Sequence, residues 1–349
     1  MISKEISEKI LFVGTDPSGK GGIATLLNSY SIIFSPFNMI VSHKFANILV
    51  QIGLAVFAYL KFLYFLIWKD ISIVHIHTAS YRAFYRESFF VLISKLFRKK
   101  IILHIHGGEF EVFYRRHPDY ILYICSKVDC LVAVSSYFSY LFHRYNLNRN
   151  IKILYNIVDC PYLNKKKISG NKVRILYLGA IDENKGIFEV LECIAKNKEK
   201  FEHIISLDIA GIGNDKYLKF LIEQNELQDF VTYHGWLCKE DKHKLLSESD
   251  IYIQPSYFES LGIAIIEAMS YGIPVIATRT GGIPDLIEDG FNGFLISVGD
   301  MDSLMEYLIY FIKNPDKRRW MGDNGKEKSK LFFTEAIELE ILKLYKSLI

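Results

Sequence analysis

The stretch Ser256-Tyr-Phe-Glu-Ser-Leu-Gly-Ile-Ala-Ile-Ile-Glu267 decides the fold of this chain, because a short loop in it joins a strand pattern to a helix pattern. Residues 250–255 form an apolar run typical of a buried strand, and residues 256–260 indicate a loop. Residues 261–271 predict a helix that has a glycine in its first turn. Strand, loop and helix in this order form half of a Rossmann-like unit, so the sequence predicts an α/β fold.

The start of the predicted helix is suited to an anion. The first amides of a helix lack intrahelical partners and carry the positive end of its dipole, so a pyrophosphate can bind there without a metal. Glu259 and Glu267 add carboxylates that can accept hydrogen bonds from sugar hydroxyls. Two glutamates without further motifs are more often solvated. Here the apolar run at 263–266 leaves the Glu267 carboxylate in an apolar setting, where it needs a hydrogen-bonding or charged partner.

Further motifs occur on both sides of this stretch. In order and spacing, the series resembles the retaining GT-B glycosyltransferases of group 1, also called GT4, whose signature is two glutamates separated by seven residues. The motifs are Ile175-Leu-Tyr-Leu-Gly179, Asn184-Lys-Gly186, Ile209-Ala-Gly-Ile-Gly-Asn-Asp215, Val231-Thr-Tyr-His-Gly-Trp236, Gly272-Ile-Pro-Val-Ile-Ala-Thr278, Gly281-Gly-Ile-Pro-Asp-Leu-Ile-Glu-Asp-Gly290 and Asn292-Gly-Phe-Leu295.

The resemblance implies two Rossmann-like domains whose parallel sheets face each other across a cleft. Residues 1–165 are expected to form the acceptor-binding domain and residues 172–330 the nucleotide-sugar-binding domain. Residues 331–349 are expected to form a C-terminal helix that crosses back to the N-terminal domain. Polar and turn-forming residues before residue 173 support this boundary.

The implied reaction transfers a sugar from a nucleoside diphosphate to an acceptor hydroxyl with retention of the anomeric configuration. A UDP-sugar is the expected donor, and neither a cofactor nor a metal is expected. Preorganised positive charge at the departing diphosphate is the main catalytic requirement. The expected catalytic residues are His106, Lys185 and Glu259, and the expected donor-binding residues are Gly21, Gly22, Lys185, Glu259, Ser260, Leu261, Gly262 and Glu267.

The first half of the chain contains strand patterns that end in polar or glycine-rich segments. The glycine-rich loop at 15–23 lacks the Gly-Lys-Ser/Thr ending of a P-loop and the GxGxxG spacing of a dinucleotide-binding loop. Binding of ATP or of a dinucleotide is therefore poorly supported. His106 follows the strand pattern at 101–105, where ligands of parallel sheets gather. His75, His77 and His104 are more simply core or supporting histidines. His104 and His106 are close enough in sequence to suggest a metal pair, but no further ligands follow at suitable spacing, so no metal is expected there.

One departure from the family pattern concerns the cationic clamp, the arginine and lysine that the family places at the donor diphosphate. The family places an arginine five positions before Lys185, where this chain has Ala180. Lys172, Arg174 or Arg279 could replace it. The gap supports one alternative, a catalytically weak, donor-binding partner subunit of a glycosyltransferase complex. A GT-B nucleotide-sugar epimerase is a further alternative because it shares the two-lobed fold, but the series of motifs around the two glutamates favours the transferase.

Composition narrows the class of protein further. The 349 residues suggest two domains, and the net charge of +3 without a basic, aromatic-interleaved block argues against nucleic acid. Five scattered cysteines indicate reduced thiols, and no secretory signal is evident at the N-terminus. We therefore expect a cytoplasmic protein.

The apolar run Ile48–Trp68 is long enough to suit a bilayer. Gln51 and Lys61 interrupt it, and a core strand follows directly, so a helix packed in the domain or partly embedded at the membrane interface is expected. Aromatic residues and basic clusters nearby suit contact with the cytoplasmic face of the inner membrane. The expected acceptor is a glycan or a lipid-linked oligosaccharide in bacterial capsule, O-antigen or exopolysaccharide assembly.

Overall fold

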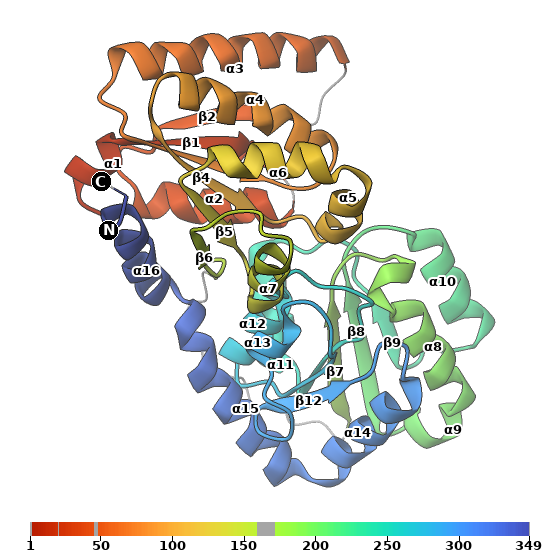
Figure 1. Ribbon diagram of the computed structural model, residues 1–349. Helices are drawn as coiled ribbons and strands as arrows, with labels where there is room; N and C mark the ends of the chain where they lie inside the picture. Colours follow the sequence, from red (N-terminus) through yellow and green to blue (C-terminus); the bar gives the residue numbers. More distant parts are fainter. Residues whose placement is uncertain (1, 20, 45–47, 159–171, 349) are drawn as a thin grey trace. The chain divides into compact units, whose positions relative to one another are not determined.

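The computed structural model describes residues 2–19, 21–44, 48–158 and 172–348 and contains two compact units (Figure 1). Unit 1 comprises Met1–Asp159 and Phe332–Ile349, and unit 2 comprises Cys160–Leu331. The chain therefore leaves unit 1 and returns to it at its end. The linker expected between residues 165 and 172 lies outside the described residues, as does Cys160; the other four cysteines are free thiols.

Unit 1 is built on one parallel sheet of six strands. Its strands are β1 (Ile10–Thr15), β2 (Met39–His43), β3 (Ile73–Thr78), β4 (Lys100–Ile105), β5 (Cys130–Ala133) and β6 (Ile151–Ile153), in the order β2-β1-β3-β4-β5-β6. Its helices are α1 (Lys4–Glu8), α2 (Gly22–Ile33), α3 (Ile48–Trp68), α4 (Arg82–Leu96), α5 (Phe110–Arg116), α6 (Pro118–Lys127), α7 (Ser136–Arg144) and α16 (Thr334–Lys346).

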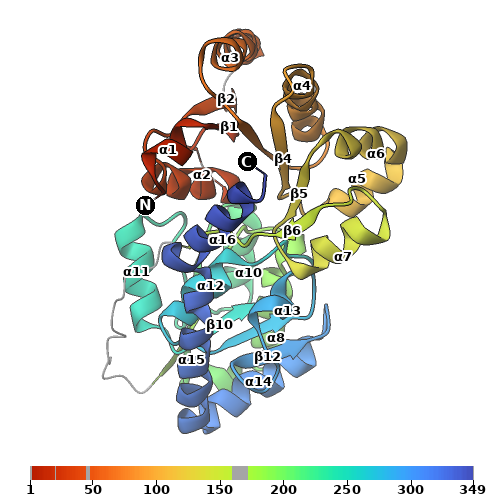
Figure 2. The ribbon, with the colours of Figure 1, turned by 60° about the vertical axis from the view of Figure 1, so that its left-hand side comes forward.

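Helices cover both faces of this sheet, which is why its strands are buried on both sides (Figures 1 and 2). On one face, Phe12 of β1 and Ile73 of β3 share a core with residues of α2 and of the C-terminal helix α16. Tyr345 of α16 is fully buried there. The last helix of the chain is thus part of the core of unit 1.

Unit 2 repeats the same architecture. Its strands are β7 (Val173–Leu178), β8 (Ile205–Ala210), β9 (Val231–Tyr233), β10 (Ile251–Gln254), β11 (Val275–Thr278) and β12 (Gly293–Ile296), in the parallel order β12-β11-β10-β7-β8-β9. Its helices are the 3-10 turn η1 (Glu183–Lys185), α8 (Ile187–Lys196), α9 (Lys198–Phe201), α10 (Asp215–Gln224), α11 (Lys239–Glu248), α12 (Ile263–Ser270), α13 (Ile283–Leu286), α14 (Met301–Lys313) and α15 (Pro315–Ser329), and the 3-10 turn η2 (Lys330–Phe332) leads back to unit 1.

The predicted α/β class with two Rossmann-like sheets is confirmed. The helix expected at 261–271 is shorter than predicted, because α12 begins at Ile263 and ends at Ser270. Gly262 lies before the first turn rather than in it. Its φ of 98° is left-handed, a conformation that cannot continue into a right-handed helix and that glycine adopts at little cost.

The apolar run Ile48–Trp68 forms helix α3. Ala58, Phe62 and Leu66 recur at helical spacing and are buried. Lys61 donates from Nζ to the Met39 carbonyl at 3.0 Å, which fixes this side chain against the protein. Among the described residues, no helix has the length and apolarity needed to cross a membrane.

Candidate active site

The Glu259 loop lies at the carboxyl end of β10, between that strand and α12. Glu259 Oε1 accepts hydrogen bonds from Lys185 Nζ at 2.6 Å, Ser256 Oγ at 3.2 Å and Gln254 Nε2 at 3.3 Å. The Lys185 and Glu259 side chains are 22% and 18% exposed, so the pair is partly screened from water but still reachable. Two of the predicted catalytic residues are therefore in direct contact.

Lys185 is positioned by a tight turn. It ends the 3-10 turn η1, and Gly186 follows with a left-handed φ of 69° before α8 begins. A Cβ at Gly186 would lie 2.3 Å from the Pro255 carbonyl oxygen, so only glycine lets this turn approach the end of β10. Tyr257 N also donates to the Asn184 carbonyl at 2.8 Å, which joins the lysine turn to the Glu259 loop.

A second glycine fixes the Glu259 backbone from the other side. Gly281 has a φ of 51°, and a Cβ there would lie 1.8 Å from the Glu259 carbonyl oxygen. That oxygen accepts a hydrogen bond from Gly282 N at 3.0 Å. The loop is thus held between two close backbone approaches, at Gly186 and at Gly281.

Glu267 has the polar partner that its apolar setting requires. Lys242 Nζ of α11 lies 2.6 Å from Glu267 Oε1, and the two side chains are 32% and 16% exposed. Sequence reasoning did not identify Lys242, because helix α11 is polar nearly throughout and nothing in its pattern singles out one lysine.

Tyr252 of β10 connects the surroundings of the two glutamates. Its hydroxyl lies within hydrogen-bond distance of the Leu178 carbonyl, at 3.0 Å, and of the Gln254 side-chain oxygen. Burial raises the pKa of Tyr252 well above its usual value, and the carboxylates of Glu259 and Glu267 act in the same direction. Tyr252 therefore stays neutral, and its hydroxyl contacts Gln254, which in turn donates to Glu259.

The cations considered as replacements at Ala180 differ in position. Arg174 lies at the amino end of β7 and pairs with Asp208 at 3.1 Å and Glu248 at 2.8 Å. Lys172 lies one residue before β7 and donates to the Glu202 carbonyl at 2.8 Å. Both are at the end of the sheet opposite Lys185, so neither can replace the arginine.

Arg279 is the remaining candidate. It follows β11 directly and therefore lies at the carboxyl edge of the sheet, like the Glu259 loop. Its Nη2 lies 2.8 Å from Asp289 Oδ2, and the two side chains are 55% and 40% exposed. An exposed pair of this kind is weak and can open for a ligand.

The predicted site residues of unit 1 lie before α2 and after β4. Gly21 precedes α2 with a φ of 115°, and Gly22 is the first residue of that helix. Chain neighbours aside, no atom of the described residues lies within 4 Å of a Cβ built at Gly21. His106 donates from its backbone to the Thr78 carbonyl, and its Nε2 lies 3.0 Å from His77 Nδ1. Burial lowers the pKa of His106, which keeps this ring neutral near pH 7, although part of its surface is exposed.

Three comparisons relate this chain to known proteins. A protein of the cps region of Klebsiella pneumoniae is 26% identical over 256 residues, which span 69% of each chain. The amylovoran biosynthesis glycosyltransferase AmsK of Erwinia amylovora is 32% identical over 147 residues, 39% of this chain and 35% of that one. The solved structure of Anabaena HepE in complex with UDP-glucose superposes with a TM-score of 0.77 over 97% of this chain and 99% of the other, at 19% identity.

The HepE likeness shows a shared fold, the GT-B fold, which consists of two Rossmann-like units. The sequence of residues 161–328 matches the family described as glycosyl transferases group 1. This stretch contains Lys185, Glu259 and Glu267, the three side chains around which the site of unit 2 is built. Residues 161–328 thus belong to the glycosyl transferases group 1 family.

Proposed function

We propose that the protein is a retaining glycosyltransferase that moves a sugar from a nucleoside diphosphate, UDP in the first instance, to an acceptor hydroxyl. The observation that carries the proposal is the Lys185–Glu259 pair beside the start of α12. Without donor, the two side chains neutralise each other. When donor binds, the lysine exchanges its carboxylate partner for the diphosphate, and Glu259 becomes free to accept hydrogen bonds from the sugar.

Departure of the diphosphate requires positive charge that is already in place. Lys185 supplies a full charge, and the backbone amides at Ser260, Leu261 and Gly262 lie at the positive end of the α12 dipole. Glu267 accepts hydrogen bonds from the ribose hydroxyls while Lys242 orients it. Family membership implies that a donor phosphate oxygen takes the acceptor proton, so no carboxylate nucleophile is assigned.

Unit 1 carries further proposed contacts to the substrates. Gly21 and Gly22, at the start of α2, are proposed to approach the donor phosphates through their backbone, and the neutral ring of His106 can hydrogen-bond the transferred sugar or the acceptor. No divalent ion is required at the diphosphate in this scheme. We therefore expect added Mg²⁺ or Mn²⁺ to leave turnover unchanged within about twofold.

The test is donor binding and turnover in Lys185→Ala and in Lys200→Ala, a matched change of an exposed lysine in the same unit. Loss of one positive donor at a developing oxyanion costs about 3 kcal/mol, so turnover should fall by about 100-fold or more in the first variant only. Equal turnover in both variants would refute the role of Lys185.

A partner subunit without strong catalysis is the second candidate, and Ala180 is the observation that favours it. Such a subunit would bind the nucleotide in a Lys185-dependent way but would not release free nucleoside diphosphate when acceptor is added. A transferase releases it only with acceptor. Measuring free UDP with and without acceptor separates the two functions.

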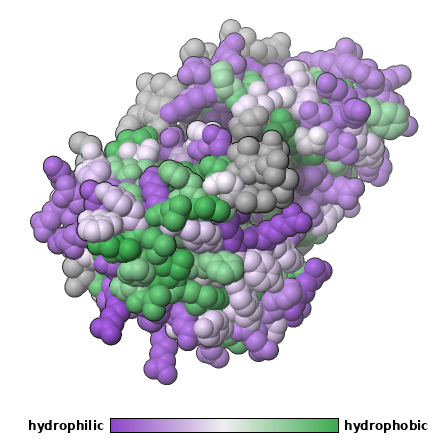
Figure 3. All heavy atoms as spheres, turned by 90° about the horizontal axis from the view of Figure 1, so that it is seen from above, coloured by the Kyte–Doolittle hydropathy of each residue, from purple (hydrophilic) through white to green (hydrophobic). Residues whose placement is uncertain are grey.

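The acceptor is proposed to be a glycan, in lipid-linked form, at the cytoplasmic face of the inner membrane, where bacterial surface polysaccharides are assembled. The exposed side of α3 and α4 supports this proposal, because it gathers large apolar side chains on one face (Figure 3). Exposed basic residues Lys95, Arg98 and Lys100 border the end of α4 and suit anionic headgroups. The apolar side chains are Val56, Phe57, Leu60, Tyr64, Ile67, Trp68, Phe89 and Leu96.

Co-sedimentation with vesicles that contain anionic lipid tests this surface. Leu60 and Trp68 are 62% and 73% exposed, and the double change to serine should weaken vesicle binding roughly tenfold. Leu339→Ser, on α16 of the same unit and 59% exposed, is the matched control and should bind like the wild type. If the wild-type protein does not co-sediment with these vesicles, the membrane contact is wrong.

A further inference from the structure

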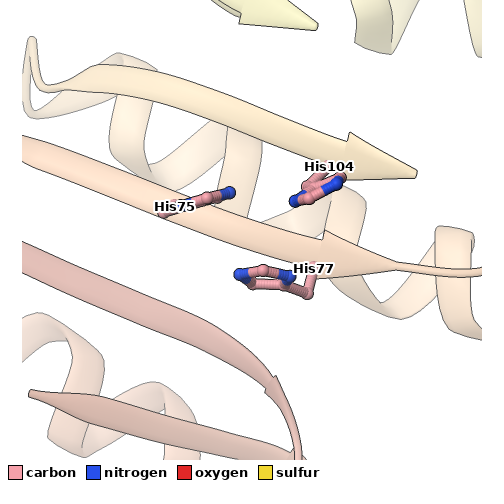
Figure 4. A group of neighbouring side chains, drawn as sticks. All are labelled: His75, His77 and His104. Carbon is pink, nitrogen blue, oxygen red and sulfur yellow. The ribbon is translucent and has the colours of Figure 1, made fainter. Parts of the chain in front are cut away.

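Three buried histidines of unit 1 lie together on one face of its sheet (Figure 4). His75 and His77 are two residues apart on β3, so their side chains point to the same face of the sheet. His104 on β4 is the register partner of His77. Their ring centroids are 4.3 to 5.5 Å apart, and every side chain is at most 2% exposed. Sequence spacing did not group them, because only the pairing of β3 with β4 brings His104 beside the other two.

Within the described part of the chain, each of the three rings has a buried nitrogen without a hydrogen-bond partner. These are Nε2 of His75, Nε2 of His77 and a ring nitrogen of His104, whose ring also interacts with the backbone of Leu154. Leaving a buried donor or acceptor unpaired costs about 1–3 kcal/mol, so three in one place require an explanation. Close packing of the strands does not provide it, since an apolar side chain would fill the same space without that cost.

The Nδ1 atoms of His75 and His77 each contact a polar group that lies outside the cluster. His75 Nδ1 lies 2.7 Å from the Tyr345 hydroxyl of α16, and His77 Nδ1 lies 3.0 Å from His106 Nε2. When each Nδ1 carries the proton and donates it, each Nε2 keeps a lone pair that is available to a metal ion. Metal-binding histidines show this pattern, in which an outer group fixes the ring through its second nitrogen.

We propose that His75, His77 and His104 form a binding site for a divalent transition metal, with Zn²⁺ the ion that three imidazoles and a water or hydroxide suit best. One nitrogen from each ring lies within 4.8 Å of the other two. Tetrahedral zinc with bonds of about 2.0–2.1 Å separates its nitrogens by about 3.4 Å, so the rings need to approach by at most about 1.4 Å. Small rotations of the side chains supply that movement.

None of the three proposed ligands is a proposed donor-binding residue, and the site touches the proposed transfer chemistry only through the contact of His77 with His106. Its expected effect is structural. A bound ion would join β3 to β4 and, through the Tyr345 hydroxyl, would favour the docked position of α16. Binding to the folded state alone then raises the melting temperature by mass action.

The experiment uses the untagged full chain. Its metal content is measured after purification, and the metal-free protein is titrated with Zn²⁺ and, as a spectroscopic probe, with Co²⁺. We expect one ion per chain, a rise in melting temperature with Zn²⁺, and visible absorption bands of tetrahedral Co²⁺. Mg²⁺ should produce none of these effects, because neutral imidazoles are poor ligands for it.

Three variants make the outcome decisive. His104→Asn removes a ligand and should abolish the cobalt bands, whereas His143→Asn changes an exposed histidine of the same unit and should keep them. Tyr345→Phe keeps all three ligands and the buried ring but removes the hydroxyl, so zinc affinity should fall roughly 10- to 100-fold. This variant decides the question if His104→Asn does not fold.

Wild-type protein that binds less than one ion per ten chains and melts at the same temperature with and without Zn²⁺ overturns the proposal. Cobalt bands that persist unchanged in His104→Asn overturn it as well, because the ion would then be bound elsewhere.

Discussion

Replacing Gly281 by alanine should disturb the Glu259 loop without touching a catalytic side chain. Gly281 has a left-handed φ of 51°, and the added Cβ would lie 1.8 Å from the Glu259 carbonyl oxygen. A contact of this kind has to open to about 3.2 Å, so the backbone at Glu259 or at Gly281 must move by about 1.4 Å. The hydrogen bond from Gly282 N to the same oxygen is expected to break.

The effect on stability follows from two contributions. An alanine in the left-handed region costs about 1 kcal/mol more than glycine, and the lost hydrogen bond costs about 1 kcal/mol more. With about 2–4 °C per kcal/mol for a unit of this size, the melting transition of unit 2 should fall by about 4–8 °C. Because a misplacement of about 1 Å can cost about 100-fold in rate, kcat/KM for donor turnover should fall by about that factor.

The matched control is Gly290→Ala. Gly290 also has a left-handed φ, of 76°, but no atom lies within 4 Å of a Cβ built there. We expect this variant to lose about 1 kcal/mol and to retain kcat/KM within about twofold. Scanning calorimetry and an assay of released UDP measure both quantities. If the two variants lose the same stability and the same activity, the close approach of Gly281 to Glu259 does not fix the site, and the reasoning is refuted.

Three further substitutions test neighbouring parts of the site. Lys242→Ala should weaken donor binding about tenfold in titration calorimetry, because Glu267 loses the charged partner that orients it. Lys244→Ala changes an exposed lysine of the same helix and should leave donor affinity unchanged. Equal donor affinities in the two variants would contradict the orienting role of Lys242. Arg174→Leu should lower the melting temperature but leave donor affinity within about twofold, since its ion pairs lie at the opposite end of β7; a large loss of affinity would restore it as a phosphate ligand. Ala180→Arg should tighten donor binding about tenfold. Position 180 is exposed and follows the carboxyl end of β7, so an arginine there would add a positive charge for the donor phosphates. Unchanged donor affinity would show that another cation already completes the cationic clamp.

Much of the fold was predictable from the sequence because local patterns carry it. Continuous apolar runs predicted the parallel strands, and the order of the motifs predicted two Rossmann-like units. The polar loop between β10 and α12 correctly located Glu259 and the start of a helix. The exact first residue was wrong, since the sequence does not state that Gly262 adopts a left-handed φ.

Partnerships between distant segments were not predictable. Lys242 and Glu267 are 25 residues apart and meet only when α11 packs beside α12. Gly281 and Glu259 are likewise brought together by the loop after β11. The unsuitability of Arg174, by contrast, could have been inferred, because the start of a predicted parallel strand lies away from the edge where ligands bind.

The order in which the units are completed follows from the return of the chain to unit 1. A ribosome releases the sequence from the N-terminus, so Cys160–Leu331 is synthesised in full before Thr334–Lys346 exists. Until Tyr345 is synthesised, the sheet face that carries Phe12 and His75 lacks its final cover. During synthesis, unit 1 therefore exposes an apolar and histidine-rich sheet face until unit 2 and the C-terminal helix α16 have been made. We expect chains truncated before Thr334 to depend on chaperones far more than the full chain does.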